Sequence, residues 1–247
     1  MKKNLKGKIL NIETIAKDTV KLQFSTVLKE ILPGQFVSIL IPNKTLRRPF
    51  SVANFAYDKH LAEGIITVLF KLKGDGTNYL KTLKTGDIID YLAPLGNNFT
   101  IPDYDKKALL IGAGIGIAPM LYLKKVLDKN SVDNFLISGF KDEDEVIEGS
   151  DSTVIGGSVM DKVQALIDKF KPEILYSCGP KVVLQMVCDI AKKNGLYAEI
   201  AMEKVMACGI GVCRGCVIKL NKGDKVQNAS VCADGPVFSG AEVIWEE

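Results

Sequence analysis

The most chemically distinctive feature of the sequence is a set of four cysteines near its C-terminus. Four residues separate Cys208 from Cys213, two separate Cys213 from Cys216, and fifteen separate Cys216 from Cys232. The C-x4-C-x2-C spacing is typical of plant-type [2Fe–2S] sites, in which four thiolates hold two irons. Glycines between the cysteines let the backbone curl and direct N–H groups at the sulfurs. The spacing therefore predicts an iron–sulfur site with these four cysteines as ligands.

Two other interpretations of the four cysteines stay open. A structural zinc site also takes four ligands, but it commonly shows two short C-x2-4-C pairs, and only one half of this segment has that form. Disulfides require an oxidising compartment, of which the sequence gives no sign. The remaining cysteines, Cys178 and Cys188, lie in a predicted strand and a predicted helix, so we expect neither to bind iron.

Two stretches at the ends of predicted strands are suited to a nucleotide. Gly112-Ala-Gly114-Ile-Gly116-Ile-Ala-Pro119 lies between a strand and a helix, where glycines can bring a phosphate against the helix N-terminus. It is a poor Rossmann fingerprint, because Ile117 stands at the sixth position, and a tight turn without a ligand is almost as good an interpretation. Cys178-Gly179-Pro180 ends another strand, where open α/β sheets bind ligands. The alternative for Cys178 is a half-buried small residue.

Two stretches in the first hundred residues are suited to an anionic cofactor. The stretch Arg47-Arg48-Pro49-Phe50-Ser51 places two guanidinium groups and a hydroxyl at the start of a predicted strand. An exposed basic pair is the commoner meaning of such a dipeptide. Lys73-Gly-Asp-Gly76-Thr77 could bind a pyrophosphate through backbone N–H groups and the threonine hydroxyl. A hairpin turn is an equal alternative for this second stretch.

The first hundred residues that carry these stretches have the pattern of β structure. Six short runs alternate in polarity or are rich in β-branched residues, with turn residues between them. They are 8–12, 19–24, 34–41, 50–53, 65–71 and 87–91. Because no helix is expected among them, the pattern predicts a closed antiparallel barrel over residues 1–102.

From residue 103 the pattern changes to alternating strands and helices. We expect strands at 108–112, 134–139 and 174–178, and helices at 118–127, 160–170 and 181–194. This alternation predicts a parallel, helix-covered sheet, which we expect to form a nucleotide-binding α/β domain over residues 103–202. A small [2Fe–2S] segment over residues 203–247 would follow it.

Composition excludes several classes of function. The 247 residues are 47% hydrophobic and 25% charged with a net charge of +3, which is ordinary for a soluble globular protein and gives no polybasic footprint for nucleic acid. The basic N-terminus lacks the apolar run of a signal peptide, and no apolar segment reaches membrane-spanning length. We therefore expect a cytoplasmic protein with reduced thiols. The single histidine, His60, is expected at the surface.

The order of the motifs resembles the ferredoxin–NAD(P) reductase superfamily. Arg-Pro-Phe-Ser is followed by Gly-x-Gly-Thr, by Leu95-Gly-Asn-Asn-Phe99, by the glycine-rich turn and by Cys-Gly-Pro. The cysteine segment, which closes with Cys232-Ala-Asp-Gly-Pro-Val-Phe238, restricts the resemblance to one family within this superfamily. Over nearly its whole length the chain is similar to the family of electron-transfer subunits of the two-subunit, NAD-dependent (class 1B) dihydroorotate dehydrogenases.

The resemblance implies three cofactors and no catalytic residue on this chain. FAD would bind at Arg48, Pro49, Phe50, Ser51, Leu69, Phe70, Lys71, Gly76 and Thr77. NAD would bind at Gly112, Gly114, Gly116, Pro119, Cys178, Gly179 and Pro180. In the family, electrons pass from an FMN-containing catalytic subunit through a [2Fe–2S] cluster and FAD to NAD+, in pyrimidine biosynthesis. The implied partner is that catalytic subunit, with two copies of each chain, and we expect Ile210, Val212 and Val237 at the interface.

One stretch departs from the family, and other functions remain open. Residues 149–159 read Gly-Ser-Asp-Ser-Thr-Val-Ile-Gly-Gly-Ser-Val, where the family tends to carry an acidic Asp-Gly-Ser-x-Gly turn near the nicotinamide site. Phe140-Lys-Asp-Glu-Asp-Glu145 would favour NAD over NADP if it lies at the adenosine ribose, where it would repel a 2′-phosphate. The alternatives are the flavin and iron–sulfur subunit of a hydrogenase or of a ferredoxin:NADP oxidoreductase, and a zinc-stabilised binding module.

Overall fold

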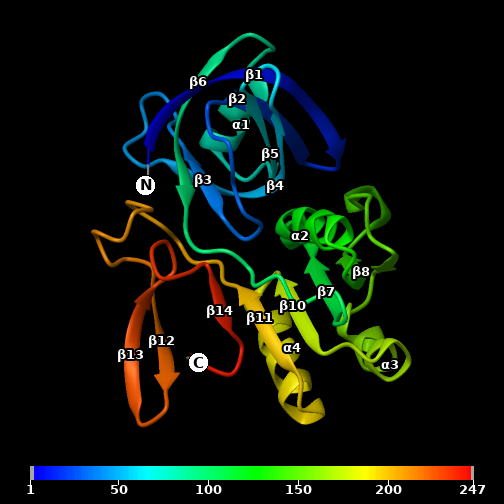
Figure 1. Cartoon of the computed structure of the whole chain (residues 1–247). Helices are drawn as coiled ribbons and strands as arrows, with labels where there is room; N and C mark the ends of the chain where they lie inside the picture. The colour runs from blue at the N-terminus through cyan, green and yellow to red at the C-terminus, as the bar shows by residue number, and fades with distance from the viewer. Residues whose placement is uncertain (1–2, 246–247) are drawn as a thin grey trace.

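Six strands close into an antiparallel barrel at the N-terminal end of the chain (Figure 1). The computed structural model describes residues 3–245. The strands are β1 (Lys3–Ala16), β2 (Thr19–Thr26), β3 (Phe36–Ile39), β4 (Arg48–Asp58), β5 (Glu63–Lys71) and β6 (Ile88–Leu95), in the order β1-β2-β5-β4-β3-β6. The alternation in β2 fills the interior, because Val20, Leu22 and Phe24 are buried. The predicted barrel is confirmed, and His60 is exposed on the turn between β4 and β5.

A short helix interrupts the barrel strands, contrary to the prediction that no helix lies among them. α1 (Asp75–Thr82) follows β5, so the hairpin interpretation of this stretch is also wrong. Thr77 Oγ1 accepts hydrogen bonds from the backbone N–H groups of Lys73 at 2.9 Å and Gly74 at 3.3 Å. These bonds close the first turn, and Leu80 anchors the helix in the barrel core. The glycines at 74 and 76 are unfavourable in helices, and for this reason the stretch has the pattern of a turn.

The second part of the chain forms a six-stranded sheet in the order β14-β11-β10-β7-β8-β9. Its parallel strands are β7 (Lys107–Ala113), β8 (Asp133–Phe140), β9 (Ser152–Ile155), β10 (Ile174–Cys178) and β11 (Tyr197–Ala201), with short turns η1 (Gly114–Gly116) and η2 (Glu143–Glu145) after β7 and β8. β9 and β11 were not predicted. The central strand β7 is buried on both faces, as its apolar run predicts.

Helices cover both faces of this sheet (Figure 1). α2 (Ile117–Lys129) packs on one face, while α3 (Met160–Phe170) and α4 (Lys181–Asn194) pack on the other. α2 also lies against the barrel, where Tyr122 Oη donates to Ile31 O at 2.6 Å. Among the helices of residues 3–245, none is long and apolar enough to cross a membrane.

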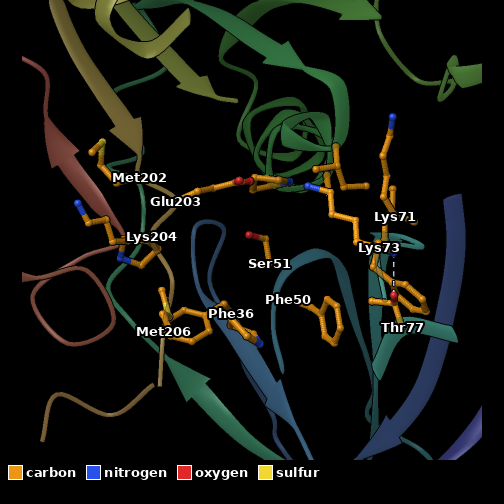
Figure 2. Close-up of a pocket in the computed structure, with 17 residues that line it drawn as sticks. Phe36, Phe50, Ser51, Lys71, Lys73, Thr77, Met202, Glu203, Lys204 and Met206 are labelled. Atoms are coloured by element: carbon orange, nitrogen blue, oxygen red, sulfur yellow. Dashed lines mark hydrogen bonds between the residues drawn. The ribbon is translucent and has the colours of Figure 1, made fainter. Parts of the chain in front are cut away.

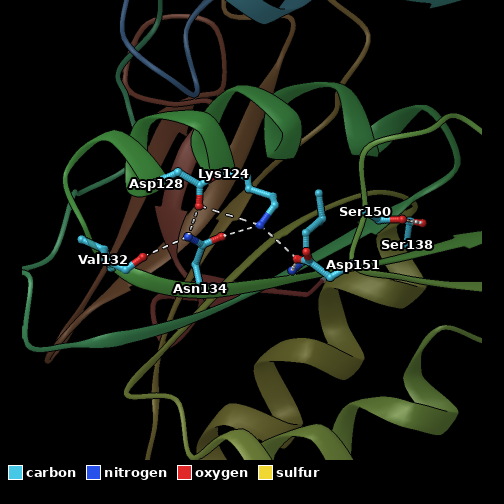
Figure 3. Close-up of polar contacts among 8 residues, drawn as sticks. Lys124, Asp128, Val132, Asn134, Ser138, Ser150 and Asp151 are labelled. Atoms are coloured by element: carbon cyan, nitrogen blue, oxygen red, sulfur yellow. Dashed lines mark hydrogen bonds and ion pairs between the residues drawn. The ribbon is translucent and has the colours of Figure 1, made fainter.

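Asp151, within the stretch 149–159, fastens the edge of the sheet (Figure 3). The carboxylate of Asp151 accepts a hydrogen bond from Leu136 N at 2.7 Å and pairs with Lys124 Nζ of α2 at 3.0 Å. Lys124 also donates to Asn134 Oδ1 of β8 at 3.2 Å. This stretch therefore has a structural role, because Asp151 ties β8 and the start of β9 to α2.

The C-terminal segment forms a small sheet and returns one strand to the large one. β12 (Val217–Lys222) pairs with β13 (Lys225–Ser230) and β15 (Val243–Ile244), whereas β14 (Val237–Ser239) lies antiparallel to β11. This pairing buries Val237, which is 5% exposed, so the expectation that Val237 serves an interface is wrong. The barrel residues Phe36 and Leu95 share an apolar cluster with the C-terminal segment.

Candidate functional site

A cleft opens between the barrel, the start of α2 and residues 202–206 (Figure 2). Eight residues expected at a cofactor line it: Pro49, Phe50, Ser51, Leu69, Phe70, Lys71, Thr77 and Pro119. Phe50 and Phe70 place their ring centroids 5.2 Å apart. Aromatic walls beside the lysines at 71 and 73 and the Ser51 hydroxyl suit a planar ring that carries an anionic tail. The residues present therefore fit FAD.

Two further residues expected at FAD, Arg48 and Gly76, meet at the first turn of α1 rather than on the cleft wall. Arg48 donates from Nη1 to Leu46 O at 2.7 Å. A Cβ on Gly76 would lie 3.1 Å from Arg48 Nε, so glycine leaves room for the guanidinium there. Thr77 donates its hydroxyl to Gly74 O at 3.0 Å, which directs this hydrogen into the helix cap. The guanidinium and the positive helix end together suit a pyrophosphate.

The two turns expected at the nicotinamide nucleotide pack against each other at the carboxyl ends of β7 and β10. A Cβ on Gly116 would lie 2.7 Å from Gly179 N, and a Cβ on Gly179 would lie 2.8 Å from the Ala113 methyl carbon. Glycine is therefore required for this close packing. Gly112 also has a packing role, since its Cβ would lie 2.9 Å from Ile117 Cα.

Cys178 is fully buried rather than half-buried. It is 2% exposed, and burial raises the pKa of its thiol, with the charge of Glu203 adding to this effect. Gly179 and Pro180 border a second cavity, which shares Met202, Glu203 and Lys204 with the cleft. Gly114 has a φ of +55° and open space beside it. Of the residues expected at NAD, Pro119 alone lines the cleft itself, and the other turns lie next to it.

Sequence reasoning missed the residues that enter the cleft from the end of β11. They are Met202, Glu203, Lys204 and Met206. Glu203 extends into the cleft (Figure 2). The residue is exposed, yet loss of hydration raises the pKa of its carboxyl group, and the charge of Lys73 opposes this effect. β11 was not predicted. Had it been, the rule that ligands lie beyond the carboxyl ends of parallel strands would have indicated residues 202–204.

The structure brings the four expected cluster ligands into two pairs. Cys213 N donates to Cys208 Sγ at 3.4 Å, and Cys232 N donates to Cys216 Sγ at 3.4 Å. Gly209 and Gly211 have φ values of +69° and +91°, which glycine adopts without strain, so these residues let the loop curl as predicted.

The environments of the two pairs differ. Backbone N–H groups, chiefly that of Cys213, lower the pKa of Cys208 to about 6, which favours the thiolate that binds iron. Burial is the main cause that raises the pKa of Cys232 to about 12, and the neighbouring Cys216 adds to it. Among the described residues, no group of three or more His, Cys, Asp or Glu side chains is placed to hold a metal ion. Four cysteines arranged as two pairs suit a [2Fe–2S] cluster, which takes four thiolates.

Two family models match segments of this chain. Residues 6–99 match the oxidoreductase FAD-binding domain family. Residues 203–244 match the iron–sulfur cluster binding domain of dihydroorotate dehydrogenase B. The solved structure of an NADH-dependent reduced ferredoxin-NADP oxidoreductase, described for flavin-based electron bifurcation, is similar to this chain. Its TM-score is 0.82, with 29% identity over 97% of this chain and 90% of that one. Ferredoxin-NADP+ reductase from Plasmodium falciparum shares the fold, with a TM-score of 0.61 at 18% identity over 80% and 96% of the two chains.

Relatives named "Dihydroorotate dehydrogenase B (NAD(+)), electron transfer subunit" match along most of their length. The protein of Caldanaerobacter subterraneus subsp. tengcongensis is 35% identical, over 99% of this chain and 100% of its own. That of Streptococcus mutans is 36% identical, over 90% and 93% of the two chains. The predicted fold and the resemblance are confirmed, and the chain belongs to the family of electron transfer subunits of NAD(+)-dependent dihydroorotate dehydrogenase B.

Proposed function

We propose that this chain carries electrons from a dihydroorotate dehydrogenase catalytic subunit to NAD+ through a [2Fe–2S] cluster and FAD, in pyrimidine biosynthesis. One observation carries the proposal: the cysteine segment forms a wall of the flavin cleft. Met206 and Pro236 line the cleft, two residues before Cys208 and four after Cys232. Two cofactor sites that share a wall are suited to electron exchange without a diffusing carrier.

Each part of the chain has a distinct role in this proposal. When bound, a flavin exchanges electron pairs with a nicotinamide and single electrons with an iron–sulfur cluster. Arg48 and the start of α1 hold the pyrophosphate, and the cleft aromatics enclose the ring. The turns at 112–119 and 178–180 bind NAD beside the cleft. Cys208, Cys213, Cys216 and Cys232 hold the cluster.

The choice of NAD over NADP rests on the relatives' names more than on the acidic stretch after β8. Asp144 pairs with Lys17 at 3.0 Å, and Glu145 pairs with Lys71 at 2.9 Å. Lysines of the barrel therefore neutralise two of the four acidic side chains that would repel a 2′-phosphate. The curated relatives carry NAD(+) in their names.

The proposed partner is the FMN-containing catalytic subunit, with two copies of each chain. Exposed apolar side chains surround the cysteine loop, with Val205 at 88%, Val212 at 77% and Ile210 at 37% exposure. An apolar patch beside a redox centre suits the core of a stable interface. These residues replace the buried Val237 in the expected contact.

A spectrum and three assays on the purified full chain test the proposal. We expect flavin bands and a broad iron–sulfur absorbance that both bleach with NADH, and NADH oxidation with an artificial acceptor. Dihydroorotate with NAD+ should give no turnover until the catalytic subunit from the same source is added. A colourless zinc-containing protein, or dihydroorotate turnover by the chain alone, would refute the proposal.

A second candidate is the corresponding subunit of a ferredoxin-NADP oxidoreductase. It is favoured by the structural match of 0.82 in TM-score over 97% of this chain. The two candidates differ in their partner. Tight binding to a ferredoxin-linked flavoprotein, with no binding to the dihydroorotate dehydrogenase catalytic subunit, would select this second function.

A further inference from the structure

Asn97 joins the barrel to the cysteine segment, 140 residues further along the chain. Its Nδ2 donates to Val237 O at 2.8 Å and to Asp234 O at 3.3 Å, and its Oδ1 accepts from Val237 N at 2.9 Å. Its backbone N donates to Gly235 O at 2.7 Å. The side-chain amide thus satisfies both backbone groups of Val237, as a neighbouring strand would.

The barrel holds Asn97 firmly. Asn97 lies two residues beyond the end of β6, and Gln35 Nε2 fixes the preceding carbonyl, Gly96 O, at 3.2 Å. Gly96 has a φ of +75°, and a Cβ there would lie 2.5 Å from Pro236 Cδ and 2.8 Å from Gly235 O. The barrel end and the 234–237 turn therefore meet in backbone contact, with no space for a larger residue at position 96.

The turn to which Asn97 is hydrogen-bonded directly follows Cys232 in the sequence, and Cys232 in turn contacts Cys216. Asp234 Oδ2 accepts a hydrogen bond from Ser230 N at 2.7 Å, which closes the turn around Cys232. Cys232 N in turn donates to Cys216 Sγ. Displacement of the 234–237 turn would therefore move the Cys216–Cys232 pair with it. On the other side of the turn, Pro236 forms part of the cleft wall.

We propose that Asn97 is a positioning residue for electron transfer, which fixes the distance and orientation of the cluster relative to the flavin. The inference rests on the proposed function. Electron tunnelling falls steeply with the separation of two centres, so a loosened turn would slow exchange between cluster and flavin. By the proposed function, hydride exchange between NADH and the flavin takes place beside α2 and residues 178–180, and Pro236 is the one residue of the 234–237 turn that lines the cleft. We therefore expect this step to change less than electron exchange with the cluster.

Asn97→Asp tests this assignment in the full chain loaded with both cofactors. The change keeps the acceptor for Val237 N but turns a carboxylate oxygen toward two carbonyl oxygens. Loss of about 1.4 kcal/mol would speed hydrogen exchange of peptides over 233–238 about tenfold. In stopped-flow experiments, cluster reduction should slow by about tenfold or more, and flavin reduction by NADH should change by clearly less than that.

Asn98→Asp is the matched control. Asn98 is exposed and donates locally to Phe99 O at 2.9 Å, so an aspartate there can turn to solvent, and both rates and the exchange should stay close to those of the unsubstituted chain. Unaltered cluster reduction in Asn97→Asp would overturn the inference, as would a joint loss of iron and of both rates, which would indicate general unfolding. An unsubstituted chain that binds flavin but no iron would refute the proposed function and the inference with it. If Asn97→Asp has normal iron and flavin content and its cluster is reduced as fast as in the unsubstituted chain, the inference alone would be refuted.

Discussion

Lys71 Nζ lies 2.9 Å from Glu145 Oε2, and this ion pair connects the end of β5 to the η2 turn of the α/β domain. Both side chains are largely shielded, at 21% and 20% exposure. A second pair, Lys17–Asp144, lies in the same turn but is 51% and 57% exposed. Lys17 N also donates to Asp144 O at 2.7 Å. The acidic turn after β8 therefore fastens the α/β domain to the barrel.

Double-mutant cycles should separate these two ion pairs. Lys71→Met or Glu145→Gln alone should lower the free energy of unfolding by about 1–3 kcal/mol, because each leaves a shielded charge without its partner. The double substitution should recover part of this loss. The exposed Lys17–Asp144 pair should show a coupling energy of about 0–1 kcal/mol that salt screens further. Urea unfolding measures both cycles, and equal coupling energies would contradict the prediction.

Arg48→Ala should weaken FAD binding. Loss of a charge-assisted bond to a buried anion costs about 1.5–3 kcal/mol, or about one to two decades in affinity. Flavin content after purification and titration of the apoprotein with FAD measure the effect.

Arg47→Ala is the neighbouring comparison for this prediction. Arg47 pairs with Asp90 Oδ1 at 2.7 Å and donates to Ser38 O and Asp90 O, so it clamps barrel strands. Its loss should lower stability while flavin affinity per folded molecule changes less than in Arg48→Ala. Equal loss of flavin affinity in the two variants would argue against a cofactor role for Arg48.

Cys213→Ser should greatly reduce bound iron, since serine removes one of four thiolate ligands. Cys188→Ser makes the same change in α4, where the side chain is 8% exposed and packs beside Gly240. It should therefore leave iron content intact. Iron and sulfide analysis with the visible spectrum measures both variants, and full iron retention in Cys213→Ser would disprove the ligand assignment.

Val205→Asp should weaken binding to the dihydroorotate dehydrogenase catalytic subunit, because a charge would enter the apolar centre of the proposed interface. A loss of about 2 kcal/mol or more, about 30-fold in affinity, is typical of an interface hot spot. Val226→Asp is the control, since Val226 is also exposed but lies on β13, outside the cysteine loop. Sedimentation of the mixed subunits measures binding, and similar affinities for the two variants would exclude the patch around Val205.

The sequence by itself determined the parts of this protein whose signals are local. The glycines between Cys208 and Cys216 predicted a curled loop, and the structure shows one. The predicted limits of α3 and α4 agree with those observed, because both helices have a clear amphipathic period. The apolar run at 108–112 is also a local signal, and it predicted a strand that is covered on both faces.

Tertiary structure alone decided which distant residues meet. The partner of Lys71, the contacts of Asn97 and the entry of Glu203 into the cleft depend on pairings between segments that no short window contains. β14 is three residues long, and it is defined by its pairing with β11 rather than by its composition. Backbone groups and charged side chains often find their partners in distant segments, so these partners become identifiable only once the chain is folded.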